Sequence, residues 1–566
     1  MDYSYLKIGK PNELTDTKER FKYRFFEILP GLLAWSTIGI LAALSFTNPF
    51  FVAAFIIAFD LYWLIRIGYF CSHLAAAFSV MKKVEKINWF EKLKTENLNP
   101  HTHTMSVGVN WKQIHHLIVL PFYKEEEGII RPSIEALANS AYPVKEKMIV
   151  VLASEERAGK EAQRIAERIK QNFGDKFFKF LTTIHPKDIP GELAGKGSNT
   201  AWAGKKAKEL IDRLNIPYQN IIVSSFDIDT VVPPQYFARL TYIYLTTPDR
   251  LHASYQPVPL YFNNIWEAPF LSRIAAFSTT FWALLNQERP KRLKTFSSHS
   301  MPFQALVDVD FWMTDIITED NIIFLQCFLR YDGNYRVLPL YFPVYMDANV
   351  GKNLKETAAN VYRQHKRWAW GVETIPYMLY GFSKNKGIPL RKKVVLVSDY
   401  IEGFWSWATN SFIIAVFGWL PGLVGGVEFK RSVLALNLGD IAGGIGNLAM
   451  IFLVFSAFFS INLLLLRMNP HTKRGQVAKG NYFGEANPRY GVRLGGREKR
   501  KFAWLTIQWI LTPFVMLALI ATPAIDAQTR LMLGKYMGFW VTPKFRSNPE
   551  STEGVRGDTI STEKLK

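Results

Sequence analysis

Cysteine is scarce in this chain, and acidic residues are outnumbered by basic ones. Only Cys71 and Cys327 occur among 566 residues, which excludes a disulfide framework and fits a reducing compartment. Lys and Arg number 68 against 48 Asp and Glu, and the formal charge of +20 suits anionic lipid headgroups or a nucleotide ligand. Zinc-ligand spacing, an RNP-like segment and a basic heptad region are all missing, so we expect no nucleic-acid partner.

The sequence also lacks an internal repeat and the pattern of a cleavable signal peptide. The first apolar run begins only near residue 28, and a second follows almost at once. Residues 28–46 and 49–68 are each long enough to cross about 30 Å of hydrocarbon as a helix. We therefore predict a transmembrane hairpin at 28–68 after a basic cytoplasmic N-terminus, 1–27. Basic residues flank the hairpin and place both of its ends in the cytoplasm: Lys18, Arg20, Lys22, Arg24, Arg66, Lys82, Lys83 and Lys86.

Long apolar runs return after residue 400. The runs 404–427, 441–466 and 502–525 predict a C-terminal membrane region, 401–530, with a basic cytoplasmic loop at 467–501. The last run contains Pro513 and Pro523, which interrupt helical hydrogen bonding, so a re-entrant hairpin and a plain fifth crossing both stay open. The chain is thus expected to be a multi-pass protein of the cell membrane with the bilayer as a partner. The polar end, 547–566, predicts disorder.

Residues 112–350 change to short strands alternating with amphipathic helices. Alternation of this kind predicts an α/β fold with a mostly parallel sheet, inserted between the N- and C-terminal membrane helices. Ligands of such sheets bind beyond the carboxyl ends of the strands. Residues 351–400 are expected to form interfacial helices. The strands are expected at 116–121, 148–152, 177–184 and 221–226, and the intervening helices at 126–139, 155–171 and 198–214.

Two carboxylates follow the apolar run 221–226. Asp227 and Asp229 are one residue apart, and on an extended backbone residues i and i+2 point to the same side. Mg²⁺ and Mn²⁺ prefer oxygen ligands and share them with phosphates, so this D-x-D is a candidate site for a metal–diphosphate. The alternative is that the two residues only form a turn at the end of the strand.

The stretch from Gly191 to Gly197 resembles a phosphate-binding loop but lacks its spacing. One residue too few separates the first Gly from Gly195-Lys196, and Gly follows the Lys where Ser or Thr should bind metal. Lys196 remains able to reach a diphosphate from this turn. The alternative is an ordinary Gly-rich turn with a solvated lysine.

Two further motifs contain candidate site residues. Thr318-Glu319-Asp320 precedes a predicted helix, 322–330, where Thr318 is a candidate N-cap and the two acids suit the helix dipole. In the functional interpretation Asp320 is a general base for an acceptor hydroxyl.

The second motif lies in a segment, 353–378, that looks amphipathic. Gln364, Arg367 and Trp368 share one helix face at i, i+3 and i+4, where Arg367 can bind a diphosphate and Trp368 can stack on a sugar ring. The alternative is an interfacial helix with Trp and Arg anchors.

In this order, the strand with D-x-D, the T-E-D motif and Gln364-x-x-Arg367-Trp368 resemble family 2 glycosyltransferases of the cellulose, chitin and hyaluronan synthase type. The resemblance covers residues 110–380 in detail and nearly the whole chain in architecture. Near the C-terminus, F-W-V-T-P-K resembles the F-x-V-T-x-K gating loop of cellulose synthase-like enzymes, which predicts a gating loop at 531–546. The implied fold is a nucleotide-diphospho-sugar transferase (GT-A-like) domain.

The resemblance implies roles for ten residues and a cofactor, Mg²⁺ or Mn²⁺. Asp227 and Asp229 would hold the metal, and Asp320 would be the catalytic base. The residues implied in donor binding are Glu125, Lys196, Asp227, Asp229, Arg367 and Lys544. Those implied in acceptor binding are Glu319, Gln364 and Trp368, with Gln364 and Trp368 also near the diphosphate.

The resemblance also implies the partners. The donor is a nucleotide-sugar, with a UDP-sugar favoured, and a single displacement would invert the anomeric centre. The acidic pair that usually follows the second strand appears late, as Glu155-Glu156, which leaves the nucleotide base open. The acceptor is a growing glycan in processive synthesis or, alternatively, a lipid-linked acceptor of a single-addition enzyme. A catalytically silent scaffold or nucleotide-sugar sensor is a third hypothesis, although Asp227, Asp229 and Asp320 are all present.

Overall fold

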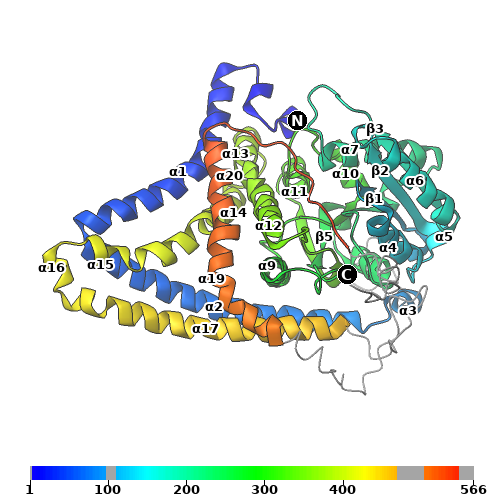
Figure 1. The fold of residues 1–566 in the computed structure, drawn as a ribbon. Coiled ribbons are helices and arrows are strands. Elements are labelled where there is room, and N and C mark those ends of the chain that lie inside the picture. The colour runs from blue at the N-terminus through cyan, green and yellow to red at the C-terminus, as the bar shows by residue number, and fades with distance from the viewer. Residues whose placement is uncertain (1–2, 97–109, 468–502, 547–566) are drawn as a thin grey trace, which may run out of the picture.

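The computed structural model describes residues 3–96, 110–467 and 503–546. Its centre is a seven-stranded sheet of order β3-β2-β1-β4-β6-β5-β7 (Figure 1). β6 runs antiparallel to β4 and β5, and the other neighbours in the sheet are parallel, which confirms the predicted mostly parallel sheet. The strands are β1 (His115–Pro121), β2 (Met148–Glu155), β3 (Lys179–His185), β4 (Ile221–Ser225), β5 (Ala253–Leu260), β6 (Ser300–Pro302) and β7 (Arg336–Tyr345).

Helices cover both faces of this sheet because its central strands are apolar on both sides. In β1, Ile118 packs in one core with α4 (Glu127–Ala138) and α6 (Lys160–Phe173). Val119 packs in a second core with α7 (Lys196–Arg213) and α11 (Glu319–Arg330). Continuous apolar strands are typical of a parallel sheet buried between two helical layers. This is the GT-A-like α/β arrangement expected from the sequence.

Some predicted boundaries are wrong near the site. A helix was expected from residue 155, but Glu155 is the last residue of β2, where it pairs with His185 of β3, and α6 begins at Lys160. Parallel pairing with β3 carries β2 three residues farther than the apolar run alone indicates. The helix expected from 322 begins at Glu319, which places the T-E-D acids inside its first turn.

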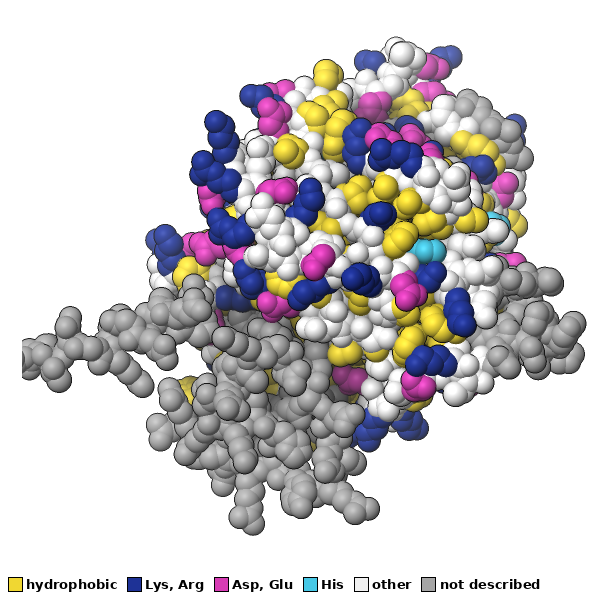
Figure 2. All heavy atoms as spheres, turned by 90° about the vertical axis from the view of Figure 1, so that its right-hand side faces the viewer, with side chains coloured by type: hydrophobic (Ala, Val, Ile, Leu, Met, Phe, Trp, Pro, Cys, Tyr) yellow, Lys and Arg dark blue, Asp and Glu magenta, His cyan; other side chains and the backbone are white. Residues whose placement is uncertain are grey.

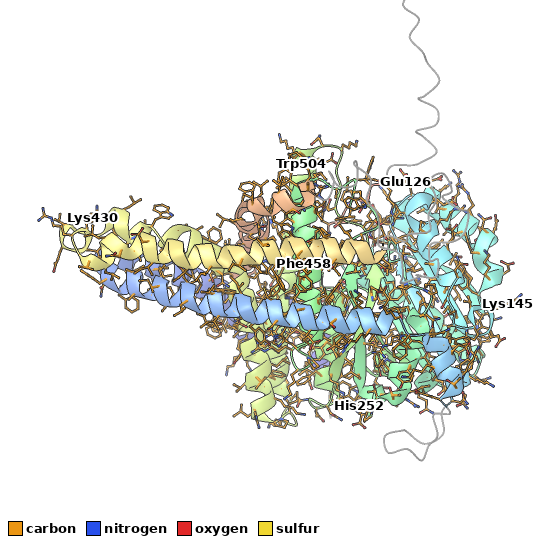
Figure 3. The ribbon with its side chains drawn as sticks, turned by 90° about the horizontal axis from the view of Figure 1, so that it is seen from below. Glu126, Lys145, His252, Lys430, Phe458 and Trp504 are labelled. Atoms are coloured by element: carbon orange, nitrogen blue, oxygen red, sulfur yellow. The ribbon has the colours of Figure 1, made fainter. Side chains whose placement is uncertain are left out.

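Apolar helices project from the domain on one side (Figure 1). Among the described residues, three helical runs are long and apolar enough to span a membrane: α1 (Thr17–Thr47), α2 (Pro49–Glu85) and residues 503–532. α2 and α17 (Val433–Arg467) lie side by side in both ribbon views, with Phe458 on α17 and Lys430 at the tip far from the domain (Figures 1 and 3). Many large apolar side chains on these helices face outward, among them Trp35, Ile65, Val454 and Ile510.

The structure corrects one prediction for the C-terminal membrane region. The run 404–427 is not one helix: α14 (Leu390–Phe412) continues as a π-helix, 413–417, breaks near Trp419, and ends after α15 (Leu420–Val424). Residues 503–532 form consecutive helical segments, and the re-entrant hairpin and the fifth crossing both stay predictions for this run. Pro513 and Pro523 lie in the first turns of α19 (Thr512–Val515) and α20 (Thr522–Met532), where a missing N–H costs little.

Between the sheet and the apolar helices lie α9 (Phe270–Gln287), α12 (Leu354–Ala369) and α13 (Thr374–Lys384). After α20 the chain returns across the domain without regular structure as residues 533–546, which we call the strap (Figure 1, red). The basic loop from residue 468 on and the polar end, 547–566, lie outside the described residues.

The face of the domain around α5 (Val144–Lys147) and α6 differs from the apolar helices. Figure 2 shows Lys and Arg side chains interspersed with Asp and Glu over this face. A mixed charged surface of this kind suits water, whereas the exposed apolar side chains of α1, α2 and α17 suit hydrocarbon.

Candidate active site

A cavity of about 1130 Å³ begins at the carboxyl ends of β1, β2 and β4, at the edge predicted for ligands. From there it continues between α9, α12 and α14 and reaches the apolar helices. Of the ten candidate residues, nine line this one cavity: Glu125, Lys196, Asp227, Asp229, Asp320, Gln364, Arg367, Trp368 and Lys544. Glu319 does not.

Asp227 and Asp229 follow β4 in a tight turn, in which the Thr230 amide donates to the Asp227 carbonyl. Asp227 and Asp229 therefore form a turn and are also placed to bind a ligand, because both residues line the cavity. Asp227 pairs with the Lys196 ammonium at 2.7 Å and accepts a 2.5 Å hydrogen bond from the Ser297 hydroxyl. Asp229 accepts a 2.9 Å hydrogen bond from the Asp347 amide and pairs with the Lys544 ammonium.

Lys196 is the first residue of α7, and its charge interacts with three acids: Asp227, Glu319 and Asp320. Its ammonium lies 2.7 Å from Asp227 and 3.6 Å from Glu319. Burial opposes its charge, but Asp227, Glu319 and Asp320 outweigh burial and raise its pKa. Burial likewise opposes the charge on Asp227, and Lys196 and Lys544 outweigh it, so the pKa of Asp227 is lowered. Both groups are held in their charged forms.

Asp320 lines the cavity from the first turn of α11, and burial raises its pKa despite the opposing Lys196 charge. Glu319 lies behind Lys196, is 3% exposed, and has its pKa raised by burial to about 7. The structure thus does not bring Glu319 to the cavity wall where an acceptor would contact it. Thr318 is the N-cap residue of α11, as predicted, but its side chain makes no capping hydrogen bond.

Glu373 explains why Thr318 does not cap. Its Oε1 accepts from the Thr318 hydroxyl at 2.8 Å, the Thr318 amide at 3.0 Å and the Ile317 amide at 3.1 Å. Its Oε2 accepts from the Trp370 indole at 2.7 Å. Glu373 lies just after Q-x-x-R-W and fixes the segment that leads to Asp320. The sequence analysis missed this residue; its only signal was an acid in an apolar stretch.

Gln364, Arg367 and Trp368 face the cavity from α12, as their spacing predicts. The Trp368 ring lies 6.4 Å from the Tyr261 ring, so two aromatic faces border the same space. Arg367 lies 5.0 Å from the centre of the Phe539 ring. Among the described residues no carboxylate lies within ion-pair distance of Arg367, and its Nε has no hydrogen-bond partner. Arg367 is therefore a cation available to an anionic ligand.

The strap lies against this cavity. Its Lys544 pairs with Asp229, its Arg546 pairs with Asp347 at 2.5 Å, and the Phe545 carbonyl accepts a 3.1 Å hydrogen bond from Asn264. Burial opposes the charge on Lys544, but Asp229 and its acidic neighbours outweigh burial and raise its pKa. The hydroxyl of Thr542 is buried without a hydrogen-bond partner in the described structure. The strap, with this unpartnered hydroxyl, closes one wall of the site.

Two glutamates lie at the ends of β1 and β2. The Glu125 carboxylate accepts a 2.7 Å hydrogen bond from the Tyr123 amide and lines the cavity. Glu155 also lines the cavity and pairs with Arg157. Although Glu155 comes late in the sequence, the extension of β2 still brings its carboxylate to the strand edge.

The carboxylates fit a hard divalent cation in their chemistry. Asp227 and Asp229 offer oxygen ligands beside a cavity, which Mg²⁺ and Mn²⁺ accept together with phosphate oxygens. Within the described residues no group of three or more His, Cys, Asp or Glu side chains is arranged around one point. Asp227 is ion-paired with Lys196, and Asp229 is ion-paired with Lys544. A metal ion can therefore bind Asp229 only if Lys544 moves away.

Residues 222–466 match the family model described as Glycosyl transferase family group 2. The matched segment contains D-x-D, T-E-D and Q-x-x-R-W, the motifs that meet in the cavity. This segment is similar to the glycosyl transferases of that family. The protein is accordingly a glycosyltransferase with helices long and apolar enough to span a membrane. A comparison with curated protein sequences gave no match.

Solved structures with a similar fold are glycosyltransferases and a synthase. The mannosyltransferase PcManGT from Pyrobaculum calidifontis, in complex with GDP-Man and Mn²⁺, is 13% identical with a TM-score of 0.39, over 71% of this chain and 98% of that one. S. aureus TarS 1–349 with UDP is 12% identical with a TM-score of 0.32, over 61% and 92%.

Glucosyl-3-phosphoglycerate synthase from Mycobacterium tuberculosis, with Mn²⁺, UDP and glucosyl-3-phosphoglycerate, is 13% identical with a TM-score of 0.28, over 51% and 88%. These values are too low for substrates or residue roles to be transferred.

Proposed function

We propose that this protein is a membrane-embedded, inverting glycosyltransferase of the cellulose, chitin and hyaluronan synthase type. It moves a sugar from a nucleotide-sugar to a hydroxyl acceptor. The observation that carries the proposal is one cavity that joins Asp227 and Asp229, Asp320, and the Arg367 face of α12, and then runs on between apolar helices. The proposal divides the chain into a glycosyltransferase domain at 112–350, helices at 351–400 and a membrane region at 401–530.

The donor diphosphate binds at the end of β4. Asp227 and Asp229 would hold a divalent cation, Mg²⁺ or Mn²⁺, which would supply positive charge there. Arg367 donates to the phosphate oxygens, and Lys196 adds a second fixed cation. These charges stabilise the departing nucleoside diphosphate. Glu125 lies close enough to the strap to stabilise the charge on Lys544. We expect the rest of the nucleotide on this side of the cavity, and a UDP-sugar is the favoured donor.

Asp320 is the proposed catalytic base. It accepts the proton of the acceptor hydroxyl while that oxygen bonds to the anomeric carbon. The bond from the anomeric carbon to the diphosphate breaks, and its electron pair leaves with the nucleoside diphosphate. Burial raises the pKa of Asp320, which makes the carboxylate a stronger base than an exposed aspartate. Gln364 and Trp368 orient the acceptor, with Trp368 and Tyr261 as its aromatic wall. Glu319 acts indirectly, by holding Lys196.

The strap is the proposed gate. Lys544, the donor diphosphate and the metal would all occupy the same space beside the Asp229 carboxylate. Lys544 therefore leaves Asp229 and binds the diphosphate when donor and metal enter. This requires the strap and the glycosyltransferase domain to share one side of the membrane, which we assign to the cytoplasm from the basic flanks of α1 and α2.

A second candidate function is single addition to a lipid-linked acceptor. The apolar continuation of the cavity between α2, α17 and the 503–532 run favours it. The decisive experiment incubates the purified chain with a panel of labelled nucleotide-sugars, Mg²⁺ or Mn²⁺ and membrane extract, and sizes the products. A ladder supports processive synthesis, and one added sugar supports single addition. Nucleotide binding without turnover of any donor contradicts the enzymatic proposal and revives a sensor.

A further inference from the structure

The cavity has a second polar region, separate from the Asp227–Asp229 edge. It is formed by a cation cluster of four basic residues around two carboxylates. The basic residues are Arg66 of α2 and Arg289, Arg292 and Lys294 of the loop after α9, and the acids are Asp399 and Glu402 of α14. Four cations face two anions, so the cluster has an excess of two positive charges. The proposed function does not use this charge.

Three of the cations are paired. Lys294 lies 2.8 Å from Asp399, and Arg292 lies 3.2 Å from the same carboxylate. Arg66 lies 2.8 Å from Glu402. Arg289 is different: among the described residues no carboxylate lies within 4 Å of its guanidinium, and no hydrogen bond from its side chain is present.

Arg289 is also half-buried, and burial together with the nearby Arg292 lowers its pKa. An unpartnered guanidinium beside other cations is costly unless an anion completes the site. The cavity wall at Arg289 is therefore suited to a group with two or more negative oxygens, which guanidinium groups bind bidentately.

Next to the cluster the cavity wall is apolar. Ile67 and Phe70 of α2, Phe452 of α17 and Met516 of the last helical run line it. Arg66 lies 16 residues from Phe50 at the tip of α2, or about 24 Å along a helix. The hydrocarbon core of a bilayer is about 30 Å thick, so the cluster lies where the apolar part of α2 meets the headgroup region.

The cluster is also within reach of the proposed chemistry. Arg292 and Ser297 are five residues apart, and Ser297 donates a hydrogen bond to Asp227. Five residues span at most roughly 18 Å between their Cα atoms. Arg289 and Asp320 line the same continuous cavity, so a phosphate at Arg289 and an acceptor hydroxyl at Asp320 can belong to one molecule.

We infer that the cation cluster binds the phosphate or diphosphate of a lipid-linked acceptor. Its hydrocarbon chain lies on the apolar wall of α2, α17 and the 503–532 run, and its polar end points to Asp320. The inference rests on the proposed function and deepens it by naming the acceptor class. A free phosphate would leave the adjacent apolar wall without an occupant, and the donor diphosphate already has Lys196 and Arg367 at the other end of the cavity.

The test measures binding of undecaprenyl phosphate to the full chain in phosphatidylcholine nanodiscs. Arg289→Gln is expected to weaken binding about tenfold, because a charge-assisted hydrogen bond contributes roughly 1.5–3 kcal/mol. Arg289→Lys should recover part of the affinity. Lys291→Gln is the matched control, since Lys291 is exposed two residues away and does not line the cavity.

Neutral undecaprenol and inorganic phosphate separate the two parts of the ligand, and both are expected to bind much more weakly than undecaprenyl phosphate. Equal binding by the Arg289→Gln and Lys291→Gln variants overturns the inference. So does equal binding of undecaprenol, which would remove the role of charge, or of inorganic phosphate, which would remove the role of the lipid. UDP binding with Mn²⁺ in the same samples tests the donor site separately, so failure of the proposed function is distinguishable from failure of this inference.

Discussion

At the scale of single residues, the carboxylates of this site have opposite protonation preferences. Asp227 is held ionised by Lys196 and Lys544, which lower its pKa against burial. Asp320 shares the cavity but makes no direct ion pair among the described residues, and burial raises its pKa. A permanently charged carboxylate suits a metal ligand, whereas a carboxylate with a raised pKa suits a group that gains and loses a proton.

The raised pKa of Asp320 predicts the pH dependence of sugar transfer. The base works only when it is deprotonated, so kcat/KM should fall as the pH drops through a pKa above the usual 3.8 of aspartate. Lys196 opposes this rise, so Lys196→Met should move the acidic limb to still higher pH. A pH profile of kcat/KM checks both points. An acidic limb at or below pH 3.8 contradicts the role of Asp320.

Glu373 is predicted to stabilise the fold around Asp320. Glu373→Gln replaces one acceptor oxygen by an NH₂ group that faces backbone or indole donors. The expected cost is about 1–3 kcal/mol, seen as a lower Tm in detergent. Glu126→Gln is the control, because Glu126 is exposed (Figure 3).

The stabilities of Glu373→Gln and Glu126→Gln are expected to depend differently on pH. Burial raises the pKa of Glu373 to about 7, from an ordinary 4.5. The folded state therefore holds this proton more tightly, and the contribution to stability falls as the pH rises from about 4.5 to about 7. Glu373→Gln should lose that part of the slope of Tm against pH, whereas Glu126→Gln should keep it. An identical slope in both variants argues against a buried, titrating Glu373.

At the scale of secondary-structure elements, local periodicity in the sequence predicted the parallel sheet and the residues that share one helix face. Alternating strands and helices gave the parallel sheet, and the i, i+3, i+4 spacing put Gln364, Arg367 and Trp368 on one face of α12. Contacts between distant segments were not predictable. Thr318 and Glu373 are 55 residues apart, Asp227 and Ser297 are 70 apart, and Asp229 and Lys544 are 315 apart. Local periodicity links none of these positions, and only the resemblance of F-W-V-T-P-K to a gating loop had assigned Lys544 to the donor site together with Asp229.

Helix breaks in the membrane region were missed for a related reason. Hydropathy reports which residues prefer hydrocarbon, but it is insensitive to where a helix changes to a π-helix or stops. The run 404–427 is apolar on average, yet it breaks near Trp419, between Gly418 and Pro421. The prolines of the last run lie in the first turns of α19 and α20, where consecutive helical segments meet.

The strap makes a prediction at this scale. A Cβ on Gly195 would lie 2.6 Å from the Phe539 ring, so Gly195→Ala should push the strap from the cavity. We expect turnover to fall severalfold and the strap to become more sensitive to added protease. Gly128→Ala is the matched control, because nothing lies within 4 Å of its added Cβ. Equal turnover and equal protease sensitivity in the two variants would contradict a strap that closes the site.

At the scale of the whole molecule, the cavity extends from the charged, water-facing domain to the apolar helices. One end lies at the carboxyl edge of the sheet, in the domain with the charged surface, and the other lies between helices with outward apolar side chains. α12 links the two parts: Arg367 and Trp368 face the cavity, while Lys366 pairs with Asp526 of α20 at 2.5 Å. This arrangement suits an enzyme that takes a soluble donor from water and an acceptor held at the membrane.

The most direct test of this account is sugar transfer by Asp320→Asn. The variant should bind the nucleoside diphosphate with Mn²⁺ as tightly as the wild-type chain and should transfer sugar at least about 100-fold more slowly, because only the proposed proton acceptor is lost. Asp175→Asn, at an exposed aspartate outside the cavity, should transfer at the wild-type rate. Transfer by Asp320→Asn at the wild-type rate would contradict the central claim.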